Sequence, residues 1–463
     1  MFIKLDTLRE RLHGVVLNKG DQGHDIDGLE GELDALADSY DDLINFSKKL
    51  SSLKIREDWP YSEPNTIDEI KNEMDPSRPL GEIREIDLDD SAKRVKAAFL
   101  GSLCGCVLGK PIEVQLTGNE IKKALEKINE WPLNQYVSKD IEGVLERVHR
   151  SFPETAREYI KYVAPDDDIN YTIMGMLILE KFGPGFTHEQ MKELWMHHLP
   201  IGTTFGPERT ILLKTGSQSL DIAHRESFVA KGGVGGSPTR VVDQTESFMD
   251  EFNDILNPGD ELCGAAIRAD AYGYAFPGNP EIAAELAWRD SSFTHNRTGI
   301  YGTMFIAAAI SLAQVLDDRN QIIETSLKFV PQKSRFFERV SVAFQDVKES
   351  STWEEAYGKI NNKLGEYGHC RIYQEIGMLI NTLIFAENIG HGICIQVSQG
   401  ADTDSFGATA GSILGAFFGL EGLEDRWLEP FNDDIHTGLA WFFERSVSEL
   451  SNRMGRLPTV VRS

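Results

Sequence analysis

The sequence has few basic residues and no long hydrophobic run, and each shortage excludes a class of protein. Its 463 residues include 47 lysines and arginines against 73 aspartates and glutamates, which gives a formal net charge of −26. Nucleic acids and anionic membranes are both bound through clustered basic side chains, so neither is an expected partner. The longest apolar runs, residues 97–109 and 406–420, are shorter than the roughly 18–20 residues of a membrane-spanning helix.

Cysteine is also scarce. The five cysteines, Cys104, Cys106, Cys263, Cys370 and Cys394, include no C-x-x-C pair. An odd, sparse set of this kind is typical of free thiols in a reducing compartment. The N-terminal segment MFIKLDTLRERLHG carries charges throughout and has no apolar core of a secretory signal. We therefore expect a cytoplasmic protein with free thiols.

Alternating strand patterns are almost absent, and the glycine-rich segment 231–240 follows no predicted strand, so no dinucleotide-binding unit is indicated. The sequence has instead an apolar periodicity of 3.6 residues, which predicts an all-α fold too large for a simple four-helix bundle. The helices that it predicts are 91–110, 117–129, 138–148, 153–163, 167–182, 187–197, 207–224, 243–255, 279–290, 299–316, 319–328, 335–348, 352–365, 374–389, 404–420 and 432–454.

The first 91 residues differ in character from the rest. Residues 1–58 are highly charged and place Leu29, Leu33, Leu36 and Leu43 at near-helical spacing. Residues 59–92 are rich in proline and acid, which predicts a connection over the protein surface with one short helix at about 66–74. We expect a charged, mostly helical N-terminal extension and linker over residues 1–91 and an all-α domain over residues 92–463.

Two apolar segments carry glycine at every fourth position, at Gly101, Gly105 and Gly109 and at Gly407, Gly411, Gly415 and Gly419. Glycine inside a helix costs about 0.5–1 kcal/mol relative to alanine, so this spacing needs a reason. Residues four apart lie on one helical face, and a glycine face lets a neighbouring backbone approach closely. The spacing predicts two tightly packed helices at the centre of the fold.

Carboxylates lie at the ends of these segments and of a third one. Glu113 follows the first glycine segment, Asp402 and Asp404 lie at the start of the second, and Asp166, Asp167 and Asp168 begin the predicted helix 167–182; these are all the residues concerned. Helix capping uses one or two such groups, and three in a row repel one another unless a cation compensates. Carboxylates without clustered histidine or cysteine favour a hard ion such as Mg²⁺, Mn²⁺ or Ca²⁺, and the spacing does not fit an EF-hand. Spacing alone does not join the three clusters.

The motifs around these residues resemble those of a known family. GSLCGCVLGKPIE (101–113), PDDDINYT (165–172) and GADTDSFGATAGSILGAFFG (400–419) resemble successive motifs of the ADP-ribosylglycohydrolases, and residues 264–302 resemble their central segment. The order and spacing match from about residue 92 to residue 445. The first 90 or so residues resemble an extension found in a bacterial branch of the family.

The resemblance implies a large orthogonal multi-helix bundle with a dinuclear Mg²⁺ site, in which Mn²⁺ is possible. It implies hydrolysis of the bond between ribose C1 and a protein side chain or small leaving group, so the partner would be a small ribosyl substrate or an ADP-ribosylated macromolecule. By motif position, Glu113 and Asp167 would be catalytic, with Glu113 positioning water or substrate, and Gly264, Arg268 and His295 would bind substrate. The metal ligands would be Asp166, Asp167, Asp168, Asp402, Asp404 and Ser405.

The sequence departs from the family pattern at four places. Cys106 replaces an aspartate of the first motif, Asp166 replaces a threonine of the second, Ile169-Asn170 replaces Thr-Gln in the same motif, and Leu262-Cys263-Gly264 replaces S-N-G or G-N-G beside the nucleotide. The last change leaves open a hydrolase of small ribosides without an ADP requirement. A separate alternative is a non-catalytic module that binds metal or ADP-ribose, with the acidic N-terminal region as a partner-docking arm. Arg268 also has an alternative role, an internal ion pair with Asp270 or with a metal-site carboxylate.

Overall fold

The computed structural model describes residues 4–213, 215, 257, 259–367 and 369–462. Its regular structure is helical, and the described residues contain no strand, only isolated bridged pairs such as Thr117 with Gly400. The predicted all-α class is therefore confirmed. The chain divides into two compact units, one of Met1–Tyr61 with Thr204–Asp260 and one of Ser62–Thr203 with Glu261–Ser463. The division that we predict at residue 91 concerns where the catalytic domain begins and stays a prediction.

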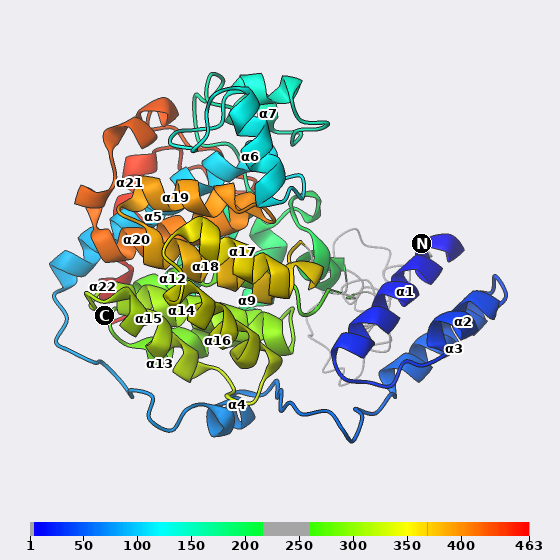
Figure 1. The fold of residues 1–463 in the computed structure, drawn as a ribbon. Coiled ribbons are helices and arrows are strands. Elements are labelled where there is room, and N and C mark those ends of the chain that lie inside the picture. The colour runs from blue at the N-terminus through cyan, green and yellow to red at the C-terminus, as the bar shows by residue number, and fades with distance from the viewer. Residues whose placement is uncertain (1–3, 214, 216–256, 258, 368, 463) are drawn as a thin grey trace, which may run out of the picture. The chain divides into compact units, whose positions relative to one another are not determined.

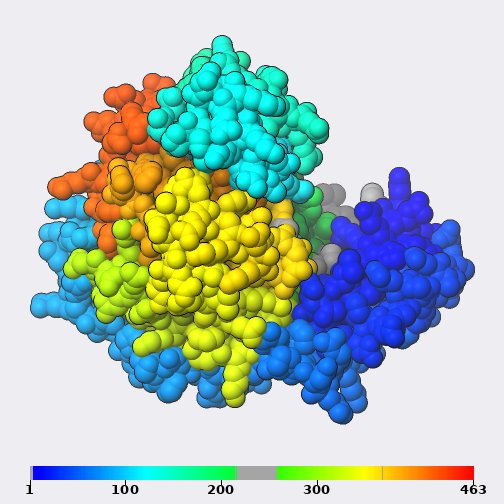
Figure 2. Space-filling view, viewed as in Figure 1, coloured from blue at the N-terminus to red at the C-terminus, as the bar shows by residue number. Residues whose placement is uncertain are grey.

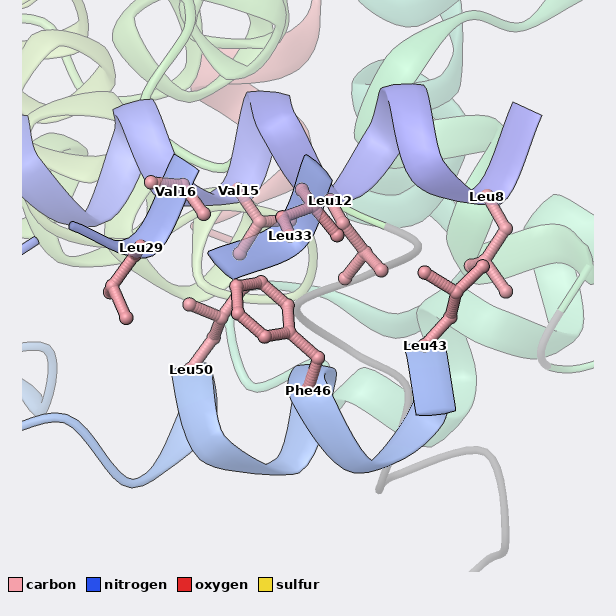
Figure 3. Close-up of a cluster of buried hydrophobic side chains, with 9 residues drawn as sticks. All are labelled: Leu8, Leu12, Val15, Val16, Leu29, Leu33, Leu43, Phe46 and Leu50. Atoms are coloured by element: carbon pink, nitrogen blue, oxygen red, sulfur yellow. The ribbon is translucent and has the colours of Figure 1, made fainter. Parts of the chain in front are cut away.

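Within residues 4–61 the first unit has three α-helices, α1 (Leu5–Asp21), α2 (Leu29–Ala35) and α3 (Tyr40–Ser51). Their apolar faces meet in one cluster, to which Leu36 adds a partly buried side chain (Figure 3). The buried members are Leu8, Leu12, Val15, Val16, Leu29, Leu33, Leu43, Phe46 and Leu50. The leucine spacing of the sequence thus identified real helices and the faces that they bury.

A connection of little regular structure leads from Tyr61 to residue 87, along the second unit. It contains the predicted short helix, α4 (Ile67–Glu73). The backbone N–H of Gln332 donates to the carbonyl of Glu73 at 2.9 Å, and that of Ile83 donates to the carbonyl of Gly278 at 2.9 Å. The predicted surface connection is therefore confirmed, and its backbone is hydrogen-bonded to the second unit along its length.

Helices build the second unit (Figure 1). Residues of the α6–α7 region, in cyan, and of α16 and α17, in yellow, form much of the outer face that Figure 2 presents. The helices are α5 (Leu88–Gly109), α6 (Gly118–Lys127), α7 (Phe152–Thr155), α8 (Asp167–Phe182), α9 (His188–His198), α12 (Asp270–Ala275), α13 (Pro280–Ser291), α14 (Arg297–Ala313), α15 (Arg319–Ser326), α16 (Arg335–Lys348), α17 (Trp353–Leu364), α18 (Ile372–Phe385), α19 (Ile389–Ser398), α20 (Thr403–Phe418), α21 (Val447–Gly455) and α22 (Leu457–Val460).

Three predicted helices are wrong over most of their length. Of residues 138–148 only the short 3-10 helix Lys139–Gly143 is helical, of residues 153–163 only the short α7, and of residues 432–454 only α21. In the last two segments, backbone groups that a helix would use are paired between the segments, because Val163 N–H donates to the Asp434 carbonyl at 2.9 Å and His436 N–H donates to the Val163 carbonyl at 2.9 Å. Helix 243–255 lies outside the described residues, as does most of 207–224. The sequence did not predict α19, whose glycine and β-branched residues are weak helix formers.

The contact between α5 and α20 is the closest helix packing in the unit, and glycine makes it possible (Figure 1). A Cβ atom on Gly105 would lie 1.9 Å from the Gly407 carbonyl oxygen, and one on Gly411 would lie 2.0 Å from that of Gly101. At Gly109 the same atom would meet the Thr403 carbonyl oxygen at 2.1 Å. The predicted close approach of the two glycine faces is confirmed along both helices.

The continuous helical segment Leu88–Ile112, which is α5 with the following short 3-10 helix, is longer than the apolar run suggested. Among the described residues it is the one segment long and apolar enough to cross a membrane by length and composition. However, 89% of its most apolar window is buried inside the structure. Its apolar character is therefore that of a core helix, packed on α20.

A buried carboxyl group also lies at this contact. Asp270 at the start of α12 is 3% exposed, and its Oδ2 accepts a hydrogen bond from Tyr274 Oη at 3.1 Å. Burial raises the pKa of Asp270 to about 7, against opposing hydrogen bonds from Ser412, Tyr274 and Ser102. Since Ser102 is in α5 and Ser412 is in α20, the hydrogen-bond partners of this carboxyl group come from both helices.

We expect Gly105→Ala to destabilise the protein strongly, by about 3 kcal/mol or more, because the overlap with the Gly407 carbonyl can be relieved only by separating the two backbones. Gly358→Ala in α17 is the matched control, since a Cβ there would have no heavy atom within 4 Å. That control should gain up to about 0.5–1 kcal/mol from helix propensity. Urea unfolding of the three chains measures both effects, and equal stabilities would contradict the role given to the glycine face.

We expect Asp270→Asn to be relatively more stable as the pH rises. Between the ordinary carboxyl pKa of 3.8 and about 7 the folded state holds the proton that the unfolded state releases, so the wild-type free energy of unfolding falls with rising pH. Asparagine stays neutral, and the difference between the two chains should grow by on the order of 1–3 kcal/mol from pH 4 to pH 8. Unfolding at several pH values tests this, with the exposed Asp425→Asn as control. A difference that does not change with pH would mean that Asp270 is ionised throughout.

Candidate metal centre

The end of α5 and the start of α20 are held together at the point where the acidic motifs begin. Thr403 Oγ1 donates to the carbonyl of Gly109 at 2.9 Å, one helical turn along α5 from the contact of Gly105 with Gly407. The chain continues from Gly109 into a short 3-10 helix, η1 (Lys110–Ile112), and then to Glu113. Asp404 follows Thr403. The glycine packing therefore brings Glu113 and Asp404 together although 291 positions separate them in the numbering.

The third acidic segment joins at the N-terminus of α8. Asp166 is the N-cap residue of this helix, and its Oδ1 accepts from the Asp168 N–H at 3.1 Å. Asp166 and Asp168 are 6% and 3% exposed, while Asp167 between them is half-buried. The cap uses one carboxylate oxygen, Asp166 Oδ1. The remaining oxygens of the three aspartates are not needed for helix capping, which is consistent with a further role.

Lys110 lies where the three segments meet. Its Nζ is 2.6 Å from Asp404 Oδ2, 2.7 Å from Asp166 Oδ2 and 2.8 Å from Glu113 Oε2. The Asp404 contact has hydrogen-bond geometry, whereas the other two are ion pairs by distance. The Lys110 side chain is 11% exposed. One ammonium group thus demonstrates that Glu113, Asp166 and Asp404 converge on a single point.

Several carboxylate oxygens of the site have no partner within the described residues. Asp168 Oδ1, Asp402 Oδ1 and Asp404 Oδ1 are buried and have no hydrogen-bond partner there. Buried, unpartnered charged oxygens are costly to a folded protein. One oxygen each from Glu113, Asp402 and Asp404 lie within 4.8 Å of one another, a spacing that one ion can bridge.

The pKa values show how poorly this charge is compensated. Burial, with the neighbouring Asp404 charge, raises the pKa of Glu113 to about 9 and that of Asp402 to about 6. Burial also raises the pKa of Asp168, with Asp166 adding to it. Burial opposes ionisation of Asp404 too, but Lys110 holds the pKa of that carboxyl below its ordinary value. A bound cation would favour the ionised form of every member, as Lys110 does for Asp404.

Two cysteines and a glutamate that the acidic motifs do not contain surround Asp402. The thiols of Cys263 and Cys370 lie 3.3 and 3.4 Å from Asp402 Oδ2. Glu375 Oε1 accepts from the Asp402 N–H at 3.2 Å, and Glu375 is fully buried in α18. An acidic residue inside the apolar sequence IYQEIGMLI was a usable signal for Glu375. No local pattern distinguishes Cys370, because its contact with Asp402 is made only by the fold.

Cys106, which stands where the resemblance has an aspartate, also contacts the site. Its Sγ lies 3.9 Å from Asp168 Oδ2 and it is 1% exposed. Burial raises the pKa of this thiol, and the adjacent carboxylates raise it further, so it is a neutral donor to Asp168. All five cysteines are free thiols, as the sequence predicts.

Ser405 lies in the first turn of α20, beside Asp404, and is 9% exposed. Its carbonyl accepts from Thr409 Oγ1 at 3.0 Å. All six predicted metal ligands thus lie at the N-termini of α8 and α20, and Glu113 lies between those two helix ends through its contact with Lys110.

The predicted substrate-binding residues Gly264, Arg268 and His295 form a second group. Arg268 is 1% exposed, forms an ion pair with Asp290 and donates to the Gly264 carbonyl at 3.3 Å and to Thr294 Oγ1 at 2.7 Å. The ion pair is internal, but its partner is Asp290. Asp270, the partner considered from the sequence, accepts from Tyr274 instead.

His295 is buried beside that arginine. Its Nδ1 lies 2.7 Å from Thr294 Oγ1, and the residue is 1% exposed. Burial, with the Arg268 charge, keeps the pKa of His295 well below its ordinary value, so the imidazole is neutral. The group is connected to the metal centre by sequence, because Cys263, which contacts Asp402, directly precedes Gly264.

The donor set fits a hard divalent cation. Oxygen atoms of aspartate and glutamate predominate, several are buried without a partner among the described residues, and they come from helix ends fixed by backbone packing. The fold and the site together define a class of all-helical proteins with a carboxylate centre that could hold a metal ion.

The comparisons with known proteins identify the family within that class. The ADP-ribosylglycohydrolase family model matches residues 87–454. The chain therefore belongs to the ADP-ribosylglycohydrolase family and is a glycosyl hydrolase. A solved chain titled "ADP-ribosylglycohydrolase-related protein complex" aligns at 16% identity with a TM-score of 0.45, over 81% of this chain and 99% of that chain. No match is found among curated proteins.

Proposed function

We propose that the chain is a magnesium-dependent hydrolase that cleaves the ribosyl C1 bond of ADP-ribosylated substrates. The observation that supports this proposal best is the convergence of Glu113, Asp166 and Asp404 on one point, 2.6–2.8 Å from a single Lys110 nitrogen. Family membership indicates the reaction class. The buried carboxylate oxygens without a hydrogen-bond partner among the described residues support a divalent ion, because its charge would compensate theirs. The resemblance predicts two ions and permits Mn²⁺ in place of Mg²⁺.

The residues that would hold Mg²⁺ are the six predicted ligands, Asp166, Asp167, Asp168, Asp402, Asp404 and Ser405. When bound, Mg²⁺ supplies Lewis acidity toward the ribose hydroxyls and lowers the pKa of a coordinated water. The protein contributes the fixed geometry, because helix ends joined through glycine backbones cannot move apart to follow a ligand.

Glu113 is the proposed general base and Asp167 the proposed second catalytic carboxylate. The Glu113 side chain is 26% exposed, more than those of Asp166 and Asp404, so water and substrate can reach it. In the hydrolysis a water oxygen bonds to C1, its proton passes to Glu113, and the C1 bond breaks with its electron pair on the leaving atom. The positive charge that develops at C1 would be stabilised by the surrounding carboxylates.

We propose that Gly264 lines the substrate and that Arg268 and His295 position it. Both side chains are 1% exposed and are too deeply buried to meet a diphosphate or a ribose directly. Arg268 donates to the Gly264 carbonyl and to the hydroxyl of Thr294, which contacts His295.

One observation favours the second candidate, a hydrolase of small ribosides. Cys263 stands where the resemblance has a nucleotide-side asparagine, and its thiol is directed to Asp402. A thiol that donates its hydrogen to Asp402 has no hydrogen left to donate to an ADP group. Calorimetry with ADP-ribose and with ribose distinguishes the candidates, because a hydrolase of ADP-ribosylated substrates should bind ADP-ribose far more tightly, while a riboside hydrolase should bind both alike.

We expect the double variant Asp402→Asn, Asp404→Asn to lower the release of ADP-ribose from ADP-ribosylated proteins by at least about 100-fold, because it removes two charged ligands from the start of α20. Chromatography of released ADP-ribose measures turnover, with arginine-linked and serine-linked substrates both supplied. Removing Mg²⁺ with a chelator should abolish the wild-type activity, and adding Mg²⁺ back should restore it.

The exposed Asp425→Asn is the matched control and should leave turnover unchanged. Circular dichroism of the double variant checks that its helices are retained. Undiminished turnover in a folded double variant, or wild-type turnover that is insensitive to the chelator, would refute the proposed metal chemistry.

A further inference from the structure

Lys110 is the only cation, among the described residues, that contacts three carboxylates of the metal centre, and no predicted role covers it. Lys110 lies between Gly109, the last residue of α5, and Pro111. The Lys110 ammonium lies within 2.8 Å of Glu113, Asp166 and Asp404, one from each acidic segment. A lysine so deeply placed is rare unless its charge is needed there.

The fold leaves the Lys110 side chain little freedom. Its residue begins η1 immediately after Gly109, whose backbone touches the Thr403 carbonyl, so the main chain at this position is fixed by the α5–α20 contact. Lys110 is itself buried, at 9% exposure. The ammonium lies within ion-pair distance of three carboxylate oxygens, and one of them, Asp404 Oδ2, accepts a hydrogen bond from it.

We propose that the Lys110 ammonium is a built-in cation that occupies one of the cation positions of the carboxylate centre, so that the native chain binds one divalent ion fewer than its carboxylates would otherwise hold. With the two positions that the resemblance predicts, the native chain would bind one ion. The inference rests on the proposed function only in taking the bound ions to be hard divalent cations.

The distances support an exchange of one cation for another. Two ions in a dinuclear centre lie about 3.5–4 Å apart and share carboxylate ligands, and each bond to oxygen is about 2.0–2.6 Å long. A nitrogen 2.6–2.8 Å from three oxygens fills the space that an ion on those oxygens would need. The repulsion between an ammonium and a divalent ion at the same three oxygens would exclude their simultaneous binding.

Oxygens that Lys110 does not contact remain available to an ion, and one oxygen each from Glu113, Asp402 and Asp404 lie within 4.8 Å of one another. Asp404 uses Oδ2 for the ammonium and keeps Oδ1 without a hydrogen-bond partner in the described part of the chain, and the same holds for Asp402 Oδ1 and Asp168 Oδ1. Asp404 can therefore bridge the ammonium and a single divalent ion through its two oxygens, as a carboxylate bridges two metals in a dinuclear centre.

The test is the number of Mn²⁺ ions bound per full-length chain, measured by electron paramagnetic resonance of the free ion during titration. We expect one ion for the wild type and two for Lys110→Met, which keeps most of the length of the side chain and removes the ammonium group with its charge. Lys123→Met, an exposed substitution in α6, is the matched control and should bind as many ions as the wild type. Thermal unfolding supplies a second measurement, since Mg²⁺ should raise the melting temperature of Lys110→Met more than that of the wild type.

An increase of one ion in Lys110→Met supports the proposal, and equal counts in the two chains overturn it. If Lys110→Met does not fold, the native chain decides: one bound ion supports the proposal and two overturn it. The proposed function fails separately, through loss of metal dependence or absence of ribosyl hydrolysis. A native chain that binds no ion beside a variant that binds one would support the role of Lys110 and contradict the metal-dependent reaction.

Discussion

The backbone contact between α5 and α20 is the constraint on which the rest of the second unit depends. Carbonyl oxygens of each helix lie where the side chains of the other would be, at Gly105 against Gly407 and at Gly411 against Gly101. Packing this close leaves little choice of register, because sliding one helix by a residue would place a Cβ against a carbonyl. The register in turn sets Lys110 and Glu113 opposite Asp404. A loosely packed pair of helices could bury as much apolar surface but would not fix carboxylates to within the length of a metal bond.

The negative charge of the buried carboxylates, where α5, α8 and α20 meet, opposes folding. Three kinds of contact offset it in part. The α8 N-terminus accepts Asp166 as its cap, the thiols of Cys263 and Cys370 donate to Asp402, and Lys110 supplies one full positive charge. These contacts offset only part of the cost, since burial still raises the pKa of Glu113 and of Asp402. A site whose negative charge is only partly neutralised in the folded protein binds a cation strongly, because the cation removes the repulsion between its carboxylates.

The sequence predicts those parts of the fold and site that neighbouring residues determine. Helices 167–182 and 335–348 have the predicted bounds, and the glycine spacing predicts the central contact. Prediction fails where distant segments use each other's backbone groups, as at Val163 and Asp434. In the site, the motifs supply the aspartates and Glu113, but the partnership of Lys110 with Asp404 joins positions 294 residues apart and has no local signature. Cys370 was missed for the same reason, since its contact with Asp402 is a property of the assembled helices, whereas Glu375 had a local signal in its apolar surroundings.

The chain enters the second unit at Ser62 and again at Glu261, and Arg335 forms an ion pair close to each of these positions. Arg335 pairs with Glu63 at 2.7 Å, just after the chain enters the second unit at Ser62, and with Glu261 at 2.6 Å, just after it re-enters from Asp260. Leu262 and Cys263 follow at once, and Cys263 contacts Asp402. Glu261 is 1% exposed, so its pairing with Arg335 fixes the backbone only two residues from a group that touches the metal centre. The position of the Cys263 thiol at Asp402 is therefore set by contacts within the second unit itself.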